Sequence, residues 1–337
     1  MDTKKNPFVF SDDNKRYHTL NYYNRTHFGQ KIYKAVLDCG FSCPNIDGTK
    51  GTGGCIFCDG GSGYFVHSGY DITSQLQREK ERICGKYGES ARFIAYFQAN
   101  TNTYAPPDVL KRLYYSVLDF PNVCGISIGT RADCLSDDII GLLSELNKKT
   151  ELTVELGMQS CHESTIELIN RRYSHEEFCN GFGKLKNAGI RTCIHIINGL
   201  PHETPEQMAE TAAEAARLAP NAVKLQMLHV IKGTVLADMF ARSKFRLLER
   251  SEYIDIIVKQ LELLPPETVI ERITGDGDKS KLIAPMWSAD KIAVLGGIDK
   301  RLAELDTWQG RSYRNQNHPL NGWFEKALNG LDTDTAP

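Results

Sequence analysis

The feature that most constrains the fold of this chain is a regular alternation of short apolar runs with longer amphipathic stretches. The apolar runs predict β-strands at residues 31–37, 92–98, 123–130, 152–159, 192–198 and 222–230. The amphipathic stretches predict helices at residues 72–86, 108–118, 136–147, 163–169, 176–187 and 205–218. Several of the runs are almost entirely apolar, which is typical of parallel strands covered on both faces. The alternation therefore predicts an α/β fold, either an open doubly wound sheet or a curved partial barrel.

Polar residues and glycines gather where the predicted strands end. They include Gln98, Asn100, Gly129, Arg131, Gly157, Gln159, Asn198, Gly199 and Gln226. Both candidate architectures bind ligands at the carboxyl ends of parallel strands. This placement predicts a binding site at that edge of the sheet.

The alternation breaks after about residue 232. A helix is predicted at 252–264, a strand at 269–274 and a further helix at 289–305, with Pro265-Pro266 between the first two. We therefore predict four parts: an N-terminal segment (1–30), the β/α array (31–231), a C-terminal α/β extension (232–328) and a disordered tail (329–337).

The composition indicates in which cellular compartment the protein works. No apolar run approaches the roughly 18 residues needed to cross a bilayer, and the first 15 residues are too polar for a secretory signal. We therefore expect a cytoplasmic protein that makes no contact with membranes. The ten cysteines then stay reduced, so metal ligation, catalysis or burial must account for them.

Four of these cysteines lie in one glycine-rich loop after the first predicted strand: Cys39, Cys43, Cys55 and Cys58. Four thiolates would make a tetrahedral zinc site, whereas an iron–sulfur cluster is the natural alternative. Cys39 decides between them, and at the end of a strand it is expected to be packed as a small apolar residue. The loop by itself leaves both metals open.

Several longer motifs lie in the cysteine loop and in the chain beyond it. They are Cys43-Pro-Asn-Ile-Asp-Gly-Thr, Gly53-Gly-Cys-Ile-Phe-Cys58, Tyr96-Phe-Gln-Ala-Asn-Thr-Asn-Thr-Tyr104, Ile128-Gly-Thr-Arg131, Glu155-Leu-Gly-Met-Gln-Ser160, Ile194-His-Ile-Ile-Asn-Gly-Leu-Pro201 and Arg272-Ile-Thr-Gly-Asp-Gly277. In this order they resemble the Elongator-catalytic-subunit-like branch of the radical S-adenosylmethionine (SAM) superfamily. Within that branch they look like the YhcC/YtqA (MnmL-type) group, over roughly residues 17–305. The resemblance implies a partial (β/α)6 radical SAM barrel followed by the extension.

The resemblance also implies a set of cofactor contacts. Cys43, Cys55 and Cys58 would hold a [4Fe–4S] cluster whose open iron binds SAM. Phe57 would lie near the adenine, and Gln98, Asn100 and Thr101 near the methionine amino group, although the usual Gly-Gly-Glu is absent there. The remaining implied SAM contacts are Glu155, Gln159, Arg171, His195, Ile196 and Gly199, with Arg171 suited to hold a carboxylate and His195 standing where similar enzymes have an Asp that contacts the ribose.

The implied chemistry is reductive cleavage of SAM to a 5′-deoxyadenosyl radical that abstracts a hydrogen from the substrate. No acid–base residue is assigned. In the group that this chain resembles, YtqA-type members convert the 5-carboxymethylaminomethyl side chain of the tRNA wobble uridine to 5-aminomethyl. The implied partners are tRNA and a one-electron donor such as flavodoxin or ferredoxin. Because the net charge is −2, RNA contacts would need a local basic face, for which the candidates are Arg242, Lys244, Arg246, Arg250, Arg272, Lys279, Lys281 and Arg314.

Two other hypotheses fit the residues. The chain could be a radical SAM enzyme that acts on an unidentified substrate other than RNA. It could also be a non-catalytic iron–sulfur or zinc protein, which would not cleave SAM.

Overall fold

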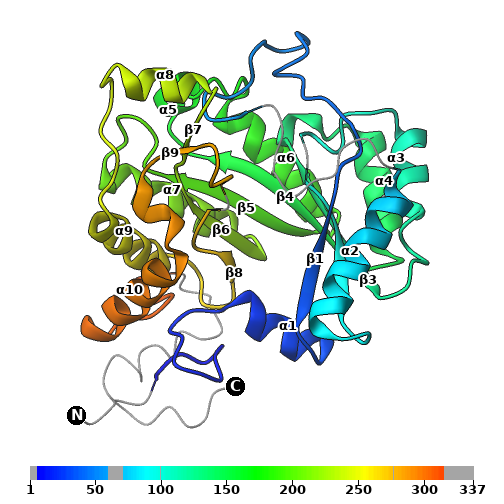
Figure 1. Ribbon diagram of the computed structural model, residues 1–337, viewed down its shortest axis with the longest axis horizontal. Helices are drawn as coiled ribbons and strands as arrows, with labels where there is room; N and C mark the ends of the chain where they lie inside the picture. Colours follow the sequence, from blue (N-terminus) through cyan, green and yellow to red (C-terminus); the bar gives the residue numbers. More distant parts are fainter. Residues whose placement is uncertain (1–5, 60–70, 99, 276, 315–337) are drawn as a thin grey trace.

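The computed structural model describes residues 6–59, 71–98, 100–275 and 277–314. Its centre is a seven-stranded parallel sheet whose strands lie side by side in chain order (Figure 1). The strands are β1 (Ile32–Leu37), β2 (Arg92–Phe97), β3 (Val123–Thr130), β4 (Leu152–Gln159), β5 (Arg191–Asn198), β6 (Ala222–Met227) and β8 (Val269–Arg272). Since the outer strands β1 and β8 do not pair with each other, the sheet is a curled partial barrel. The predicted α/β partial barrel is confirmed.

Helices connect the strands and cover the outer face of the sheet (Figure 1). They are α2 (Ile72–Tyr87), α3 (Pro107–Tyr115), α4 (Asp137–Asn147), α5 (Glu163–Leu168), α6 (His175–Asn187) and α7 (Pro205–Leu218), with a short 3₁₀ turn η1 (Ala132–Cys134) after β3. Both α6 and α7 begin with a capping box, formed by Ser174 with Glu177 and by Thr204 with Gln207. In each pair, the side chain of either residue bonds to the backbone N–H of the other. These local signals fix where each helix begins and so orient the strand that follows it.

The apolar core lies between the sheet and these helices. Phe93 and Phe97 of β2 are fully buried, and the Tyr114 ring of α3 meets Phe97 edge to face at 5.2 Å between centroids. Leu142 and Leu143 of α4 are buried in the same layer. Burial of this continuous layer keeps the carboxyl ends of the strands together on one edge.

The chain after β6 differs from the sequence prediction in one important way. Strand β8, within the predicted extension, joins the main sheet as its seventh strand and pairs with Ala222–Lys224 of β6. The predicted run 222–230 also divides, because β7 (Val230–Ile231) leaves the sheet and pairs antiparallel with β9 (Leu282–Ala284). A strand's own residues do not state which sheet edge it will extend, so sequence periodicity could not reveal either pairing.

The remaining elements are α1 (Leu20–Phe28), α8 (Val235–Ala241), α9 (Arg250–Leu263), η2 (Met286–Ala289) and α10 (Lys291–Glu304). Helices α1 and α8 were not predicted, and the helix predicted at 108–118 ends at Tyr115. The tail predicted at 329–337 lies outside the described residues. Among the helices that the structure describes, none combines the length and the apolar character that crossing a membrane requires.

Gly181 of α6 tests the packing of this layer. A Cβ at this position would lie 2.2 Å from the carbonyl oxygen of Ala132 in η1, which is backbone and cannot rotate away. We expect Gly181→Ala to lower the free energy of unfolding by about 1–3 kcal/mol, measured by urea denaturation. Gly183→Ala on the same helix is the control, because nothing lies within 4 Å of its Cβ position; equal losses in both variants would contradict the packing argument.

Candidate active site

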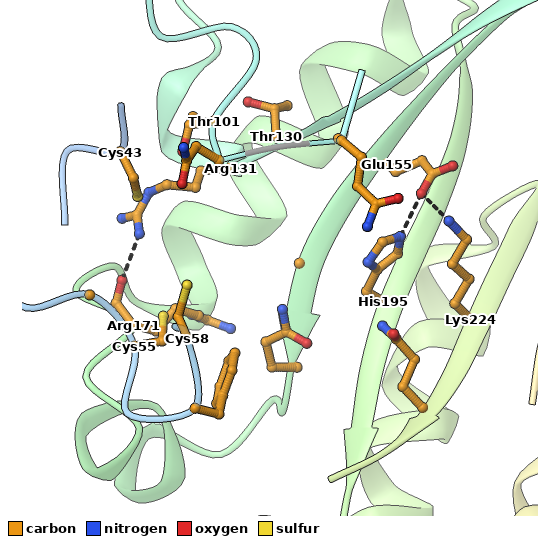
Figure 2. A pocket seen from close by; sticks show the side chains of 18 of the residues that line it. Cys43, Cys55, Cys58, Thr101, Thr130, Arg131, Glu155, Arg171, His195 and Lys224 are labelled. Carbon is orange, nitrogen blue, oxygen red and sulfur yellow. Dashed lines mark hydrogen bonds and ion pairs between the residues drawn. The ribbon is translucent and has the colours of Figure 1, made fainter. Parts of the chain in front are cut away.

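A cavity of about 290 Å³ opens at the carboxyl ends of the strands. Its wall combines three thiols from the loop after β1 with polar and charged side chains from the strands (Figure 2). The lining residues are Cys43, Ile46, Gly54, Cys55, Phe57, Cys58, Tyr96, Gln98, Asn100, Thr101, Gly129, Thr130, Arg131, Glu155, Gly157, Gln159, Arg171, Tyr173, His195, Lys224, Gln226 and Arg272. Eleven of the thirteen residues that the sequence analysis assigned to the cluster and to SAM lie on this wall.

The thiols of Cys43, Cys55 and Cys58 form one end of the cavity (Figure 2). Tight turns hold their backbone, with the Ile46 amide donating to the Cys43 carbonyl at 2.8 Å and the Cys58 amide to the Cys55 carbonyl at 2.9 Å. The buried Asn45 side chain donates to the Asn170 carbonyl at 2.6 Å and lies 3.7 Å from the Cys55 sulfur. Amide donors beside cysteine sulfurs suit an iron–sulfur cluster, whose charge lies largely on sulfur. The residues present therefore fit a cluster held by three thiolates.

Cys39 does not lie on the cavity wall. It packs against the main apolar core, whereas the other three cysteines of the loop line the cavity. This position supports the interpretation of Cys39 as a packed residue.

Arg171 lies on the cavity wall and is enclosed largely by backbone. Its side chain is 1% exposed, and its guanidinium donates to the backbone carbonyls of Met158, Ser160 and Tyr173. The guanidinium also lies 4.2 Å from the centre of the Tyr173 ring. Because most of its N–H groups are bonded to backbone, Arg171 holds the end of β4 against the segment after α5. Its predicted contact with a SAM carboxylate stays a prediction.

Gln159 ends β4 at a bulge. Its backbone is in the left-handed region (φ 64°), and a Cβ on Gly157 would lie 2.6 Å from the side-chain amide nitrogen of Gln159, so the absence of a side chain at Gly157 leaves room for the Gln159 amide. Among the described residues, nothing donates a hydrogen bond to the buried Oε1 of Gln159. Strain and an unsatisfied acceptor at a cavity wall are typical of a ligand contact.

Ile196 and Gly199 do not line the cavity, contrary to prediction. Ile196 follows His195 on β5, so its side chain points to the opposite face and is buried in the main core at 1% exposure. Gly199 lies beyond the strand, where a Cβ would meet Leu248 at 3.2 Å. The strand alternation that turns His195 inward thus turns Ile196 outward.

The other end of the cavity is charged and is built around Glu155. The Glu155 carboxylate accepts hydrogen bonds from Lys34 at 2.9 Å, Tyr96 at 2.7 Å, Ser127 at 2.6 Å and His195 at 2.8 Å, and it also pairs with Lys224. Burial by itself raises the pKa of Glu155, but Lys224 and Lys34, helped by His195, hold that pKa well below its usual range. The carboxylate is therefore ionised in the folded protein.

The sequence analysis missed most of this charged end. Lys34 and Lys224 lie within otherwise apolar strands, and Lys224 is only 3% exposed. A charged residue in an apolar strand must find a partner when buried. By that rule, Lys34, Lys224 and Glu271 could have been predicted from the sequence to form buried ion pairs. Glu271 accepts a hydrogen bond from Lys34 at 2.9 Å.

Comparison with known proteins places these features in a family. A model described as the radical SAM superfamily matches residues 46–215, and a radical SAM C-terminal domain model matches residues 220–304. The uncharacterized protein YtqA of Bacillus subtilis (strain 168) is 46% identical over 92% of this chain and 97% of its own length. Protein YhcC of Escherichia coli (strain K12) is 31% identical over 82% of this chain and 89% of its own length.

Two further matches are more distant in sequence. Elongator complex protein 3 of Mus musculus is 27% identical over 72% of this chain, which corresponds to 51% of that protein. The solved structure of an archaeal Elp3 from Methanocaldococcus infernus superimposes with a TM-score of 0.63 at 18% identity, covering 80% of this chain and 63% of that one. At that identity the structural match concerns the fold alone.

Removing the charge of Glu155 tests the energetics of the charged end. We expect Glu155→Gln to lower the free energy of unfolding at pH 7 by about 3–5 kcal/mol, because the buried Lys224 and the partly buried Lys34 lose a partner. The folded-state pKa of Glu155 is lowered, so its contribution exists above the usual glutamate range and is lost as the pH falls through that lowered value.

Chemical denaturation of both proteins across pH 3–7 would measure the effect. The gap between wild type and variant should narrow toward low pH. Glu145→Gln, which removes an exposed pair with Lys111, should leave the midpoint unchanged. A gap that is independent of pH would contradict the ion-pair interpretation.

Proposed function

This chain belongs to the radical SAM superfamily, and we propose that it converts the 5-carboxymethylaminomethyl group of the tRNA wobble uridine to 5-aminomethyl. The family model and the 46% identical relative carry the first statement. Membership implies a [4Fe–4S] cluster and SAM as cofactors. The observation that most supports the proposed reaction is a single cavity with three thiols at one end and polar, ion-paired groups at the other.

Cys43, Cys55 and Cys58 would hold the cluster, which leaves one iron without a protein ligand. When bound and reduced, the cluster supplies the electron that cleaves SAM to methionine and a 5′-deoxyadenosyl radical. Of the residues on this chain, Phe57, Gln98, Asn100, Thr101 and Gln159 would orient SAM from the wall between the thiols and the charged end. The enclosing strands and the loop would shield the reacting atoms from much of the surrounding water.

The substrate would then enter from the charged end. Lys224, Gln226 and Arg272 offer hydrogen bonds there, as a side chain with an amine and a carboxylate requires. The segment 232–328 would contact the RNA around the wobble position. Of the basic residues predicted to contact RNA, Arg272 lines the cavity. The others are exposed: Arg242, Lys244, Arg246, Arg250, Lys279, Lys281 and Arg314.

The proposal places the protein with its substrate in the cytoplasm. There, a small one-electron carrier such as flavodoxin or ferredoxin would reduce the cluster. The relationship to Elongator complex protein 3 supports tRNA as the substrate class.

Cysteine variants test the cluster assignment. After anaerobic reconstitution, wild type and Cys39→Ser are expected to bind about four irons per chain, because Cys39 is packed in the core. Cys55→Ser should lose most of the iron and the visible absorbance of the cluster. Retention of iron by Cys55→Ser together with its loss in Cys39→Ser would contradict the assignment.

The substrate is tested by incubating the reconstituted protein with SAM, a reductant and tRNA that carries 5-carboxymethylaminomethyluridine. We expect the wobble nucleoside to become 5-aminomethyluridine while 5′-deoxyadenosine accumulates, both measured by mass spectrometry. The control is the same tRNA with an unmodified wobble uridine, which lacks the substituent at carbon 5 and so offers no side-chain carbon next to an amine nitrogen. Cleavage of SAM with unchanged nucleosides would contradict the tRNA proposal and favour a substrate other than RNA.

A further inference from the structure

The His195 imidazole lies between the Glu155 carboxylate and the open cavity. Its Nε2 is 2.8 Å from a Glu155 oxygen, and its side chain is 19% exposed. In Figure 2 the other ring nitrogen is turned away from Glu155, toward the side of the cavity where the cysteines lie. Within the part of the chain that the structure describes, no hydrogen bond engages that Nδ1, and it is not among the buried polar atoms without a partner. The Nδ1 atom is therefore open to the cavity.

The charge of Glu155 decides which nitrogen of His195 carries the proton. An ionised carboxylate only accepts hydrogen bonds, and Glu155 also receives Lys34, Lys224, Tyr96 and Ser127. The Nε2 atom must then donate, and the lone pair of a neutral ring is on Nδ1. The same carboxylate–imidazole arrangement orients the base in other enzymes, where the acid fixes the tautomer and direction of the ring.

We propose that His195 is a general base that takes a proton from the substrate at the charged end of the cavity, and that Glu155 is its positioning residue. This proposal rests on the proposed function for the identity of the proton donor. A second observation supports the role: the strand alternation that buries Ile196 directs His195 alone, of these two neighbours, into the cavity.

The surrounding charges keep the ring neutral. The charged groups that act on the ring are Glu155 on β4, Lys224 on β6 and Arg272 on β8. Lys34 on β1 and Tyr96 on β2 bond to Glu155, and Glu271 on β8 pairs with Lys34 and Lys224. Burial lowers the pKa of the His195 imidazole, and the positive charges of Lys224 and Arg272 lower it further. The Glu155 carboxylate raises this pKa, but not enough to reverse the direction. A ring that is neutral at physiological pH can accept a proton, as a general base must.

The proton comes from the amine of the substrate side chain. A secondary aliphatic amine is protonated in water, and its nitrogen lone pair stabilises a radical on the adjacent carbon only after that proton leaves. In the proposed step one N–H bond of the ammonium breaks, its electron pair stays on nitrogen, and the proton forms a bond to Nδ1 of His195. The hydrogen atom is then removed from the adjacent carbon. The step needs no oxidant or reductant of its own.

The tautomer can be tested without any substrate. Nitrogen-15 NMR of the reconstituted, labelled protein should show His195 with a protonated Nε2, an unprotonated Nδ1 and a pKa below the usual histidine value. The signal is assigned by its loss in His195→Gln. A proton on Nδ1, or a pKa above the usual value, would overturn the proposal.

The function of the base is tested by the rate of nucleoside conversion. His195→Gln keeps a donor for Glu155 but has no base, so kcat should fall at least about 10²-fold at neutral pH while KM for SAM changes little. The variant should recover as the pH rises, because the substrate amine then loses its own proton to solvent. The matched control is His175→Gln on α6, where His175 also bonds a carboxylate, Glu214 at 2.7 Å, but does not line the cavity; it should convert substrate like wild type.

The outcomes separate this inference from the proposed function. If wild type converts the nucleoside and His195→Gln does so equally well, the base is wrong and the function stands. If His195→Gln mainly raises KM for SAM, His195 is a SAM contact and the base is wrong. If wild type converts nothing while NMR shows the expected tautomer, the tRNA substrate is wrong and the general-base role falls with it, whereas the orientation of His195 by Glu155 stands.

Discussion

The buried carboxylate of Glu155 bonds to side chains from five other strands of the barrel. Successive strands β1 to β6 each bring one group to this point: Lys34, Tyr96, Ser127, Glu155 itself, His195 and Lys224. The seventh strand adds Glu271, which shares Lys34. A buried charge is tolerated only when it is paired and hydrogen-bonded, so each strand must keep its register for the set to remain complete. The same constraint that holds the strands together aims His195 and Lys224 at the cavity.

The thiol end of the cavity is held mainly by backbone hydrogen bonds. There the backbone, more than side-chain charge, shapes the site: turns carry Cys43, Cys55 and Cys58, and Asn45 ties their loop to the segment after α5. Arg171 and Arg131 both lie over Tyr173 and donate to backbone carbonyls. The result is a hydrogen-bonded loop of thiols that faces an ion-paired end, with the cavity between them. A reaction that depends on the distance between a radical and one C–H bond needs its groups to be held in this way.

Much of the candidate site could be predicted because its signals are local. The thiol loop, the strand-end polar residues and the order of the β/α units can each be inferred from neighbouring residues. Arg171 shows where such inference stops: its residue type suits a carboxylate ligand, yet in the fold its donors meet backbone carbonyls. His195 shows the same limit, because its assignment as a ribose contact came from resemblance and not from its neighbours in space. The assignments of individual residues to SAM stay predictions.

The sequence by itself determined the order of the β/α units from β1 to β6 and the position of the cysteine loop, because periodicity and turn chemistry act over a few residues. Only the tertiary structure decided that β8 completes the sheet and that six strands converge on Glu155. It also decided that His195 faces the cavity while Ile196 faces the core. These features depend on contacts between residues far apart in the chain, such as Lys34 with Glu271. The energy of a buried charge is set by the groups that surround it in space, which no local stretch of sequence specifies.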